Sequence, residues 1–368
     1  MIKRFKIQCS ILFQKLKRPL NNCKNRYFLD QEIKNINLLE HSSFQNKAGT
    51  LIVKCDDIGD YLVWQNTWKY FIQNANSPLF FIGNIVWKSL FEKFNIGAAK
   101  TFWIDKKQWG NESYRNEWYK LVNELNVETA ITPLFTRNNQ LDDLLIYASN
   151  AKNKIAWYNK DNLHNTPIFI QEIKSSTKHT LEYFRNIEFA NQLYNLKNEF
   201  VIEQLMLKKD KTNTLVIFPM ANIRSKCWPL ESFIKVIRSV KANYDEILLM
   251  GGQDSVAACN LIMENCCEQG LRNLSNQTSL IETLEIISKA KLLICPDTAA
   301  LHMAVITNTQ AIVITNGTNA LRFTNYPQNV KTIYPPYFRL NLNNEKMYYS
   351  RNEIQTISYE KVIEAISS

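Results

Sequence analysis

Four segments of the sequence place charged side chains beside small residues, each directly after an apolar run. The first is the acidic turn, Asp56-Asp57-Ile58-Gly59-Asp60, which follows the apolar residues 51–53. Gly59 allows a tight backbone turn, and a carboxylate at Asp60 can accept a proton from a sugar hydroxyl as a general base. Taken alone, the segment fits a plainer interpretation better, in which Asp60 is only the N-cap of the next helix.

The second segment is the cationic loop, residues 219–229, which lies between an expected strand and a helix that Pro229 can start. Arg224 and Lys226 supply the charge and the hydrogen-bond donors that neutralise a diphosphate. A surface loop with two cations is a common alternative. The position at the carboxyl end of a strand favours a ligand site, because ligands bind there in open parallel sheets.

The third segment, residues 250–254, has two glycines directly after an apolar run. Such glycines let the backbone approach a ligand closely, and Asp254 is then placed to hold ribose hydroxyls. The signal is weak, because the segment is far short of a full dinucleotide fingerprint. A plain turn explains it equally well.

The fourth segment, residues 295–304, ends an expected strand and begins a helix. We expect Asp297 at the N-cap position, with small residues opening the helix. Free backbone amides at a helix start bind anions, and the helix dipole favours this. His302 lies about one turn after Thr298. A lone helical histidine is usually structural, but this one is unusually placed in a chain with four histidines.

Several other chemistries are not indicated. The sequence has no Asp-x-Asp triplet, which argues against the metal-chelating type of glycosyltransferase, and we expect no metal ion and no cofactor. It also lacks the serine-hydrolase elbow, the phosphate loop of nucleotide triphosphatases and the paired zinc histidines. The eight cysteines form no Cys-x-x-Cys pair, so we interpret them as reduced thiols in a cytoplasmic protein.

The elements that must position these segments follow an α/β pattern. From residue 50 onward, short apolar runs alternate with helix-like stretches, which is typical of parallel sheets. We expect strands at 51–53, 79–82, 101–104, 129–131, 154–157, 214–218, 247–250, 292–295 and 311–315. Residues 160–210 are charged and have few strand signals. The expected parts are therefore a basic extension over 1–48, an N-terminal domain over 49–195 and a C-terminal domain over 196–368.

Length and composition agree with two globular domains. The chain has 368 residues, of which 45% are hydrophobic and 21% charged, and its net charge is +10. No apolar stretch reaches the roughly 20 residues of a membrane span. Residues 1–26 hold eight Lys or Arg and no acidic residue. Such a segment can lie on an anionic inner-membrane surface, at about 1 kcal/mol per cation, or form a solvated tail; the sequence leaves both open. Nucleic-acid binding is less favoured, because no aromatic and basic pattern accompanies the charge.

Taken in order, the four segments resemble glycosyltransferase family 9, the heptosyltransferases. The similarity covers roughly residues 50–330 and consists of Asp-x-x-Gly-Asp, Lys-x-Trp-Pro, a Gly-Gly turn, a helix from Ser279 to Ile287, and a signature similar to Asp-Ser/Thr-Gly-x-x-His-x-Ala. The resemblance implies the GT-B fold: two Rossmann-like domains with parallel sheets that face a central cleft. In one variant of this arrangement the C-terminal helix packs back on the N-terminal domain.

The resemblance also implies roles for individual residues. Asp60 is then the catalytic base, and Asp57 and Gly59 belong to the acceptor-side loop. Donor binding falls to Asn222, Arg224, Lys226, Asp254, Asp297, Thr298, Ala299, Ala300, Leu301 and His302. Family members take ADP-heptose without a metal ion, invert the anomeric centre and extend the lipopolysaccharide core. The chain departs from the family at Ala299, where the signature has glycine; if that position needs a positive φ, alanine is strained there.

Two alternatives remain at this point. One is a sugar-nucleotide epimerase or hydrolase on the same fold, which consumes donor without an acceptor. The other is a non-catalytic scaffold of glycan assembly that binds the membrane through residues 1–26 and binds nucleotides too weakly to detect. The transferase interpretation expects a nucleotide-sugar and a lipid-linked or lipopolysaccharide acceptor as partners. It places the protein in the cytoplasm, with contact to the inner membrane face as an option.

Overall fold

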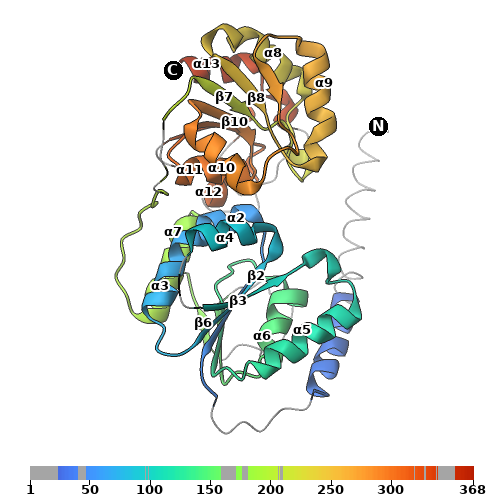
Figure 1. The fold of residues 1–368 in the computed structure, drawn as a ribbon, viewed down its shortest axis with the longest axis vertical. Coiled ribbons are helices and arrows are strands. Elements are labelled where there is room, and N and C mark those ends of the chain that lie inside the picture. Colours follow the sequence, from blue (N-terminus) through green and yellow to red (C-terminus); the bar gives the residue numbers. More distant parts are fainter. Residues whose placement is uncertain are drawn as a thin grey trace.

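The chain forms two α/β units, one above the other in Figure 1. The computed structural model describes residues 24–39, 47–95, 97, 99–158, 171–175, 181–205, 207, 210–318, 320–326, 329–336, 338 and 353–368. Within these residues each unit has one six-stranded sheet, and every strand pairing is parallel. The expectation of two Rossmann-like domains with parallel sheets is confirmed.

The first sheet has the strand order β3-β2-β1-β4-β5-β6. Its strands are β1 (Thr50–Lys54), β2 (Leu79–Asn84), β3 (Ala99–Ile104), β4 (Thr129–Thr132), β5 (Asn153–Trp157) and β6 (Gln171–Ile173). The helices of this domain are α2 (Ile58–Trp64), α3 (Trp68–Gln73), α4 (Lys88–Phe94), α5 (Glu112–Glu124), α6 (Leu144–Ala148) and α7 (Glu182–Tyr194). The apolar run of β1 is fully buried, as expected for a strand covered on both faces.

The second sheet repeats this topology in the order β12-β11-β10-β7-β8-β9. Its strands are β7 (Thr214–Ile217), β8 (Glu246–Leu249), β9 (Leu271–Asn273), β10 (Leu292–Pro296), β11 (Gln310–Ile314) and β12 (Val330–Ile333). Its helices are α8 (Leu230–Val240), α9 (Val256–Cys266), α10 (Leu280–Lys289), α11 (Ala299–Ile306), α12 (Ala320–Phe323) and α13 (Tyr359–Ser367). In both sheets the strand order reverses beside the first strand, which is where such sheets bind ligands.

Part of the predicted basic extension is built into the N-terminal domain. Residues 24–37 are helical, and Leu29 and Ile36 are buried in the core beneath α5 and α6. Glu32 is buried as well, and its carboxylate accepts hydrogen bonds from Arg115 Nε at 2.8 Å and Tyr119 Oη at 2.8 Å. The helix is therefore held by both apolar packing and a buried ion pair. Residues 1–23, with most of the basic charge, lie outside the described residues.

The C-terminal helix does not show the packing on the N-terminal domain that the sequence suggested. Among the described residues, α13 lies against α8, β11 and β12 of its own domain. Val362 is fully buried in the same core as Trp228, whose indole Nε1 donates to Ile357 O at 3.0 Å. The apolar face of α13 is thus used inside the C-terminal domain.

The two domains meet through helices on the facing sides of both sheets. Figure 1 shows α10, α11 and α12 above α2, α4 and α7, and α11 contacts α2 while α10 contacts α4. One apolar cluster runs through this junction, with Trp64 from one domain and Leu284 and Ala300 from the other. Lys93 of α4 and Glu285 of α10 add an ion pair at 2.6 Å. Because α2 follows β1 and α11 follows β10, the carboxyl ends of these two strands face the same junction.

Candidate active site

The acidic turn connects β1 to α2 at the carboxyl edge of the first sheet. Asp57 is the N-cap residue of α2, and Asp60 lies in the first turn of the helix. The simple interpretation of Asp60 as an N-cap is therefore wrong. The turn is held by residues at the end of β2 and just after it, because Asn84 Nδ2 and Trp87 Nε1 donate to Asp56 O at 2.9 and 3.1 Å.

A buried lysine lies beneath the acidic turn. Lys54, the last residue of β1, is 2% exposed, pairs with the Asp56 carboxylate and lies 5.2 Å from the Trp64 ring centroid. Burial raises the pKa of Asp56 to about 7, and Lys54 opposes this rise. Burial also raises the pKa of Asp60, which Lys54 again opposes. Asp60 is thus a carboxylate of increased basicity beside a fixed cation, as a general base requires.

The cationic loop and the start of α11 meet at the carboxyl edge of the second sheet. Lys226 Nζ lies 2.5 Å from Asp297 Oδ2, and the two side chains are 17% and 5% exposed. Asn316 Nδ2, after β11, donates to Ser225 O at 2.9 Å and so holds the loop in place. The N-cap of α11 is Thr298, one residue later than expected from the sequence. Asp297 therefore precedes the helix and faces the lysine.

His302 lies inside α11 and is buried. Its Nδ1 lies 2.9 Å from Tyr326 Oη, and burial lowers the pKa of the imidazole to about 4. The ring is therefore neutral near pH 7. Ala299 is the first residue of α11, and its φ is not among the positive values of the described residues. Alanine is consequently unstrained at this departure from the family signature.

The other predicted donor residues lie nearby, three of them exposed and two buried. Asn222 and Arg224 are exposed in the cationic loop after β7, and Asp254 is exposed after β8. Since β10, β7 and β8 are adjacent in the sheet, these residues share one edge with Asp297. Ala300 and Leu301 are buried in α11, so they offer their backbone and not their side chains.

The two halves of the site meet at Gly59. A Cβ atom built on Gly59 would lie 3.0 Å from His302 Cδ2 and 3.7 Å from Ala299 Cα. The φ of Gly59 is not positive. The glycine thus avoids a tight contact with α11, and the tight turn expected from the sequence is not its reason. This contact places Asp60 beside the helix start to which the donor roles were assigned.

Three residues at this junction were missed from the sequence: Lys54, Glu182 and Arg322. Lys54 follows an apolar run and is separated from Asp56 and Asp57 only by Cys55, which is a usable signal for a buried cation. Glu182 and Arg322 lie 140 residues apart and meet at 2.8 Å. No local pattern could have predicted that contact.

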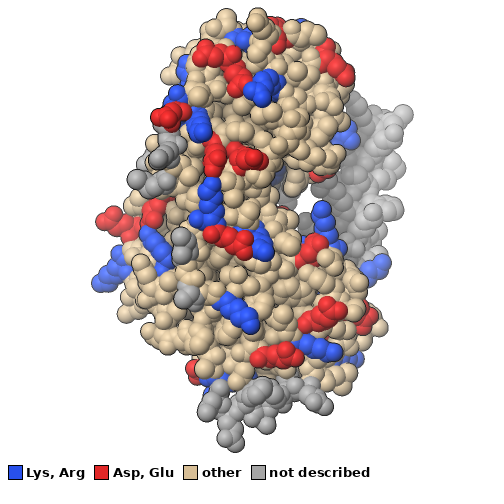
Figure 2. Space-filling view, in the orientation of Figure 1, with Lys and Arg blue, Asp and Glu red and all other residues tan. Residues whose placement is uncertain are grey.

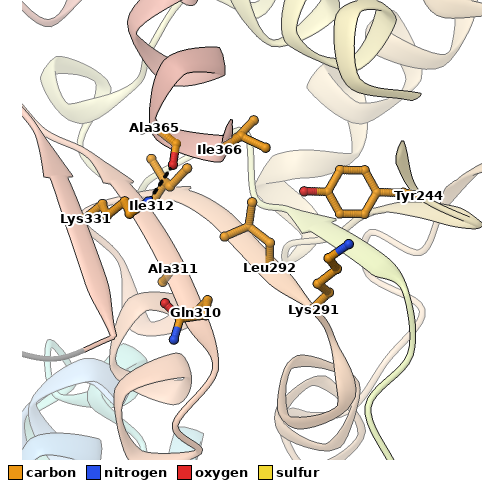
Figure 3. Close-up of a pocket in the computed structure, with 9 residues that line it drawn as sticks. All are labelled: Tyr244, Lys291, Leu292, Gln310, Ala311, Ile312, Lys331, Ala365 and Ile366. Atoms are coloured by element: carbon orange, nitrogen blue, oxygen red, sulfur yellow. Dashed lines mark hydrogen bonds between the residues drawn. The ribbon is translucent and has the colours of Figure 1, made fainter. Parts of the chain in front are cut away.

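A separate cavity of about 170 Å³ lies at the opposite edge of the second sheet (Figure 3). Its lining includes Leu292 and Gln310, the first residues of β10 and β11, and Ala365 and Ile366 of α13. Lys331 Nζ at its rim donates to Ala365 O at 2.9 Å. The cavity is at the amino ends of the strands, and it is smaller than the roughly 300 Å³ of small ligand sites. It is not part of the candidate active site.

The described residues form no candidate metal centre, and the face shown in Figure 2 carries charges of both signs. Within the described residues, no group of three or more His, Cys, Asp and Glu could hold a metal ion. The part of the chain that the structure describes also contains no helix long and apolar enough to cross a membrane. Figure 2 shows Lys, Arg, Asp and Glu intermixed over the visible face, including the narrowing between the domains.

Comparison with known proteins agrees with this architecture. A family model described as glycosyltransferase family 9 (heptosyltransferase) matches residues 147–343. The glycosyl transferase family 9 structure from Veillonella parvula DSM 2008 is 14% identical, with a TM-score of 0.68 over 88% of this chain and 97% of that chain. E. coli heptosyltransferase WaaC with ADP is 14% identical, with a TM-score of 0.68 over 87% and 99%. E. coli ADP-heptose lps heptosyltransferase II is 14% identical, with a TM-score of 0.63 over 87% and 97%. No curated protein matches the chain.

Proposed function

Because the chain belongs to glycosyltransferase family 9, we propose that it is an inverting transferase that moves heptose from ADP-heptose to a lipopolysaccharide core or a related surface glycan. The observation that carries the proposal is the contact of Gly59 with His302 and Ala299. It brings a carboxylate of raised pKa, Asp60, next to a helix start with a paired lysine. These are the two parts that a sugar transfer needs: a base and an anion site.

In the proposed reaction, Asp60 takes the proton of an acceptor hydroxyl as the hydroxyl oxygen attacks the anomeric carbon of the donor. The bond from that carbon to the diphosphate oxygen breaks, and ADP leaves. The growing negative charge faces Lys226, Arg224 and the free amides at the start of α11, which form an anion site. Stabilisation of a leaving group by such fixed charges is worth several kcal/mol in comparable sites, about 3 for a single donor.

The donor residues divide by the chemistry they offer. Lys226 and Arg224 are suited to the diphosphate, and Asp254, on the neighbouring loop, to the ribose hydroxyls. The carboxylate of Asp297 can accept hydrogen bonds from sugar hydroxyls, and its ion pair with Lys226 holds it in position. The proposed roles in donor binding need only side chains of the protein and no metal ion.

We also propose that the protein acts in the cytoplasm at the inner face of the cytoplasmic membrane. The support is the charge of residues 1–26, which attracts anionic lipids. The helix over residues 24–37 fixes the end of this segment to the N-terminal domain, the domain that carries Asp60. A lipid-linked acceptor would then reach the proposed base from the membrane side.

The decisive experiment measures transfer from ADP-heptose to a core oligosaccharide acceptor by the wild type and Asp60→Asn. We expect Asp60→Asn to lose about 10²- to 10⁴-fold in kcat, the usual contribution of a general base, with ADP affinity unchanged. NMR of the product tests inversion at the anomeric carbon, and transfer in excess EDTA tests independence from metal ions.

Asp105→Asn is the matched control for this substitution. Asp105 follows β3 at the same edge of the same sheet, and its carboxylate caps a short turn by accepting from Lys107 N at 2.9 Å. Asparagine can keep that bond, so activity should be unaffected. If Asp60→Asn retains activity within a few-fold of the wild type, Asp60 is not the base. If the wild type consumes donor without any acceptor, the protein is a hydrolase or epimerase and the proposal fails.

A further inference from the structure

One side chain of the C-terminal domain reaches across the junction and makes its hydrogen bonds with the N-terminal domain. Arg322 of α12 donates through Nε to Glu182 Oε2 at 2.9 Å, and its Nη2 lies 2.8 Å from the same oxygen. Its Nη1 donates to Thr136 Oγ1 at 3.0 Å. Glu182 opens α7, and Thr136 follows β4. These three contacts use the fork of the guanidinium as a link between domains.

Aromatic and charged neighbours hold this guanidinium in place. It lies 5.3 Å from the ring centroid of Phe135 and 4.7 Å from that of Phe323. Arg185 lies on the same Phe135 ring at 3.7 Å and donates to Glu182 at 3.0 Å. Glu182 therefore lies between two arginines, one from each domain. Because the carboxylate is only 8% exposed, the pairs are largely shielded from solvent.

Arg322 is also part of the electrostatic surroundings of Asp60. Burial raises the pKa of Asp60, and the charges that follow in importance are Lys54, Glu182, Arg322 and Asp57. Lys54 and Arg322 favour the ionised carboxylate, whereas Glu182 and Asp57 oppose it. The neutral ring of His302 faces the adjacent Gly59 from α11.

The two favourable cations differ in their origin. Lys54 belongs to β1, so it stays beside Asp60 whatever the C-terminal domain does. Arg322 belongs to the opposite domain, so its charge reaches Asp60 only while the domains are in contact. The proton affinity of the carboxylate is thus linked to the contact between the domains through one side chain.

We propose that Arg322 is an interdomain positioning residue, which docks on Glu182 and Thr136 and so brings its charge to Asp60 only when the two domains are closed. The proposal rests on the proposed role of Asp60 as the base. Its consequence is that, while the domains are in contact, Arg322 offsets part of the rise in the pKa of Asp60 that burial causes, so a larger fraction of the carboxylate is ionised than without this arginine.

A matched pair of variants separates this role from domain contact in general. Arg322→Met removes the charge and the three contacts, whereas Arg322→Lys keeps the charge and loses the fork. Lys93→Met removes a second interdomain ion pair, Lys93–Glu285 at 2.6 Å, and Lys93 is not among the main charges that act on Asp60. Both methionine variants weaken domain contact, but only the first changes the charge beside the base.

The first readout follows Asp60 directly and needs no activity. The ¹³Cγ signal of Asp60, identified by its absence from Asp60→Asn, is titrated in the ADP complex of each variant. We expect the titration of Arg322→Met to move to higher pH and that of Lys93→Met to match the wild type. If Arg322→Met titrates as the wild type does, the proposal is overturned, whether or not the protein transfers heptose.

The second readout is the pH profile of kcat/KM for the acceptor. We expect Arg322→Met to lose roughly tenfold in kcat, typical of a lost charged contact, with its acid limb displaced to higher pH and ADP affinity unchanged. Arg322→Lys should show a smaller displacement. An equal loss in Arg322→Met and Lys93→Met with no displacement would show a structural contact only and overturn the proposal. Inactivity of the wild type with donor and acceptor would instead refute the proposed function, while the carboxyl titration still decides the role of Arg322.

Discussion

Replacement of Lys226 by methionine tests the proposed diphosphate site most directly. The lysine Nζ lies 2.5 Å from Asp297 Oδ2, and the aspartate is 5% exposed. Methionine fills a similar volume without charge. It therefore removes the attraction for the diphosphate and also leaves a buried carboxylate without this partner at the place where the diphosphate would bind.

The expected loss follows from these two effects. A hydrogen bond to a charged group contributes about 1.5–3 kcal/mol, which corresponds to a roughly 10- to 150-fold increase in Kd for ADP. Repulsion by the unpaired Asp297 carboxylate adds to this loss. The double variant Lys226→Met with Asp297→Asn removes both charges, so it should bind ADP more tightly than Lys226→Met alone.

Isothermal titration calorimetry with ADP on the two single variants and the double variant completes the cycle. Lys331→Met is the control, because Lys331 is a cation of the same domain that bonds Ala365 O at the opposite edge of the sheet. Its affinity for ADP should equal that of the wild type. The reasoning would be refuted by a Lys226→Met protein whose Kd is within threefold of wild type, or by single losses that simply add in the double variant.

Two further predictions concern stability. Glu32→Ala should lower the free energy of unfolding by about 3–5 kcal/mol, because it leaves the buried Arg115 guanidinium without its ion-pair partner; urea denaturation measures this, and a negligible change would show that residues 24–37 are not needed by the domain. His302→Asn should remove a pH dependence. The folded imidazole has a pKa lowered by burial to about 4, against 6.5 in the unfolded chain, so the wild type loses stability as the pH falls between these values. The loss amounts to about 3 kcal/mol, and a difference between the two proteins that stays constant with pH would contradict it.

The sequence predicted nine of the twelve strands and missed three that lie at sheet edges. All nine expected strands are present within one or two residues of their predicted bounds. The missed strands are β6 (Gln171–Ile173), β9 (Leu271–Asn273) and β12 (Val330–Ile333), and each is the last strand at an edge of its sheet. Edge strands tolerate polar residues, and these three lack the apolar run by which the other strands, including the edge strand β3, were recognised.

The candidate site was predictable where it depends on strand ends and not where it depends on contacts between domains. The carboxyl-edge rule correctly grouped the cationic loop with Asp297, although the N-cap is Thr298 and not Asp297. The surroundings of Asp60 could not be predicted in this way, because Glu182 and Arg322 come from distant parts of the chain. Their meeting depends on how the two domains dock, and no periodic pattern encodes that geometry.

The close approach at Gly59 has a consequence for how such chains can change over evolution. One methyl group is accommodated at Ala299, where the family signature has glycine, but a methyl group at position 59 would meet the His302 ring at 3.0 Å. The space at this point is bounded by residues of both domains, Gly59 on one side and Ala299 and His302 on the other. The residues at positions 59, 299 and 302 should therefore covary in size among relatives. A chimera that joins the N-terminal half of one relative to the C-terminal half of another should keep its activity only when these three positions are inherited as a compatible set.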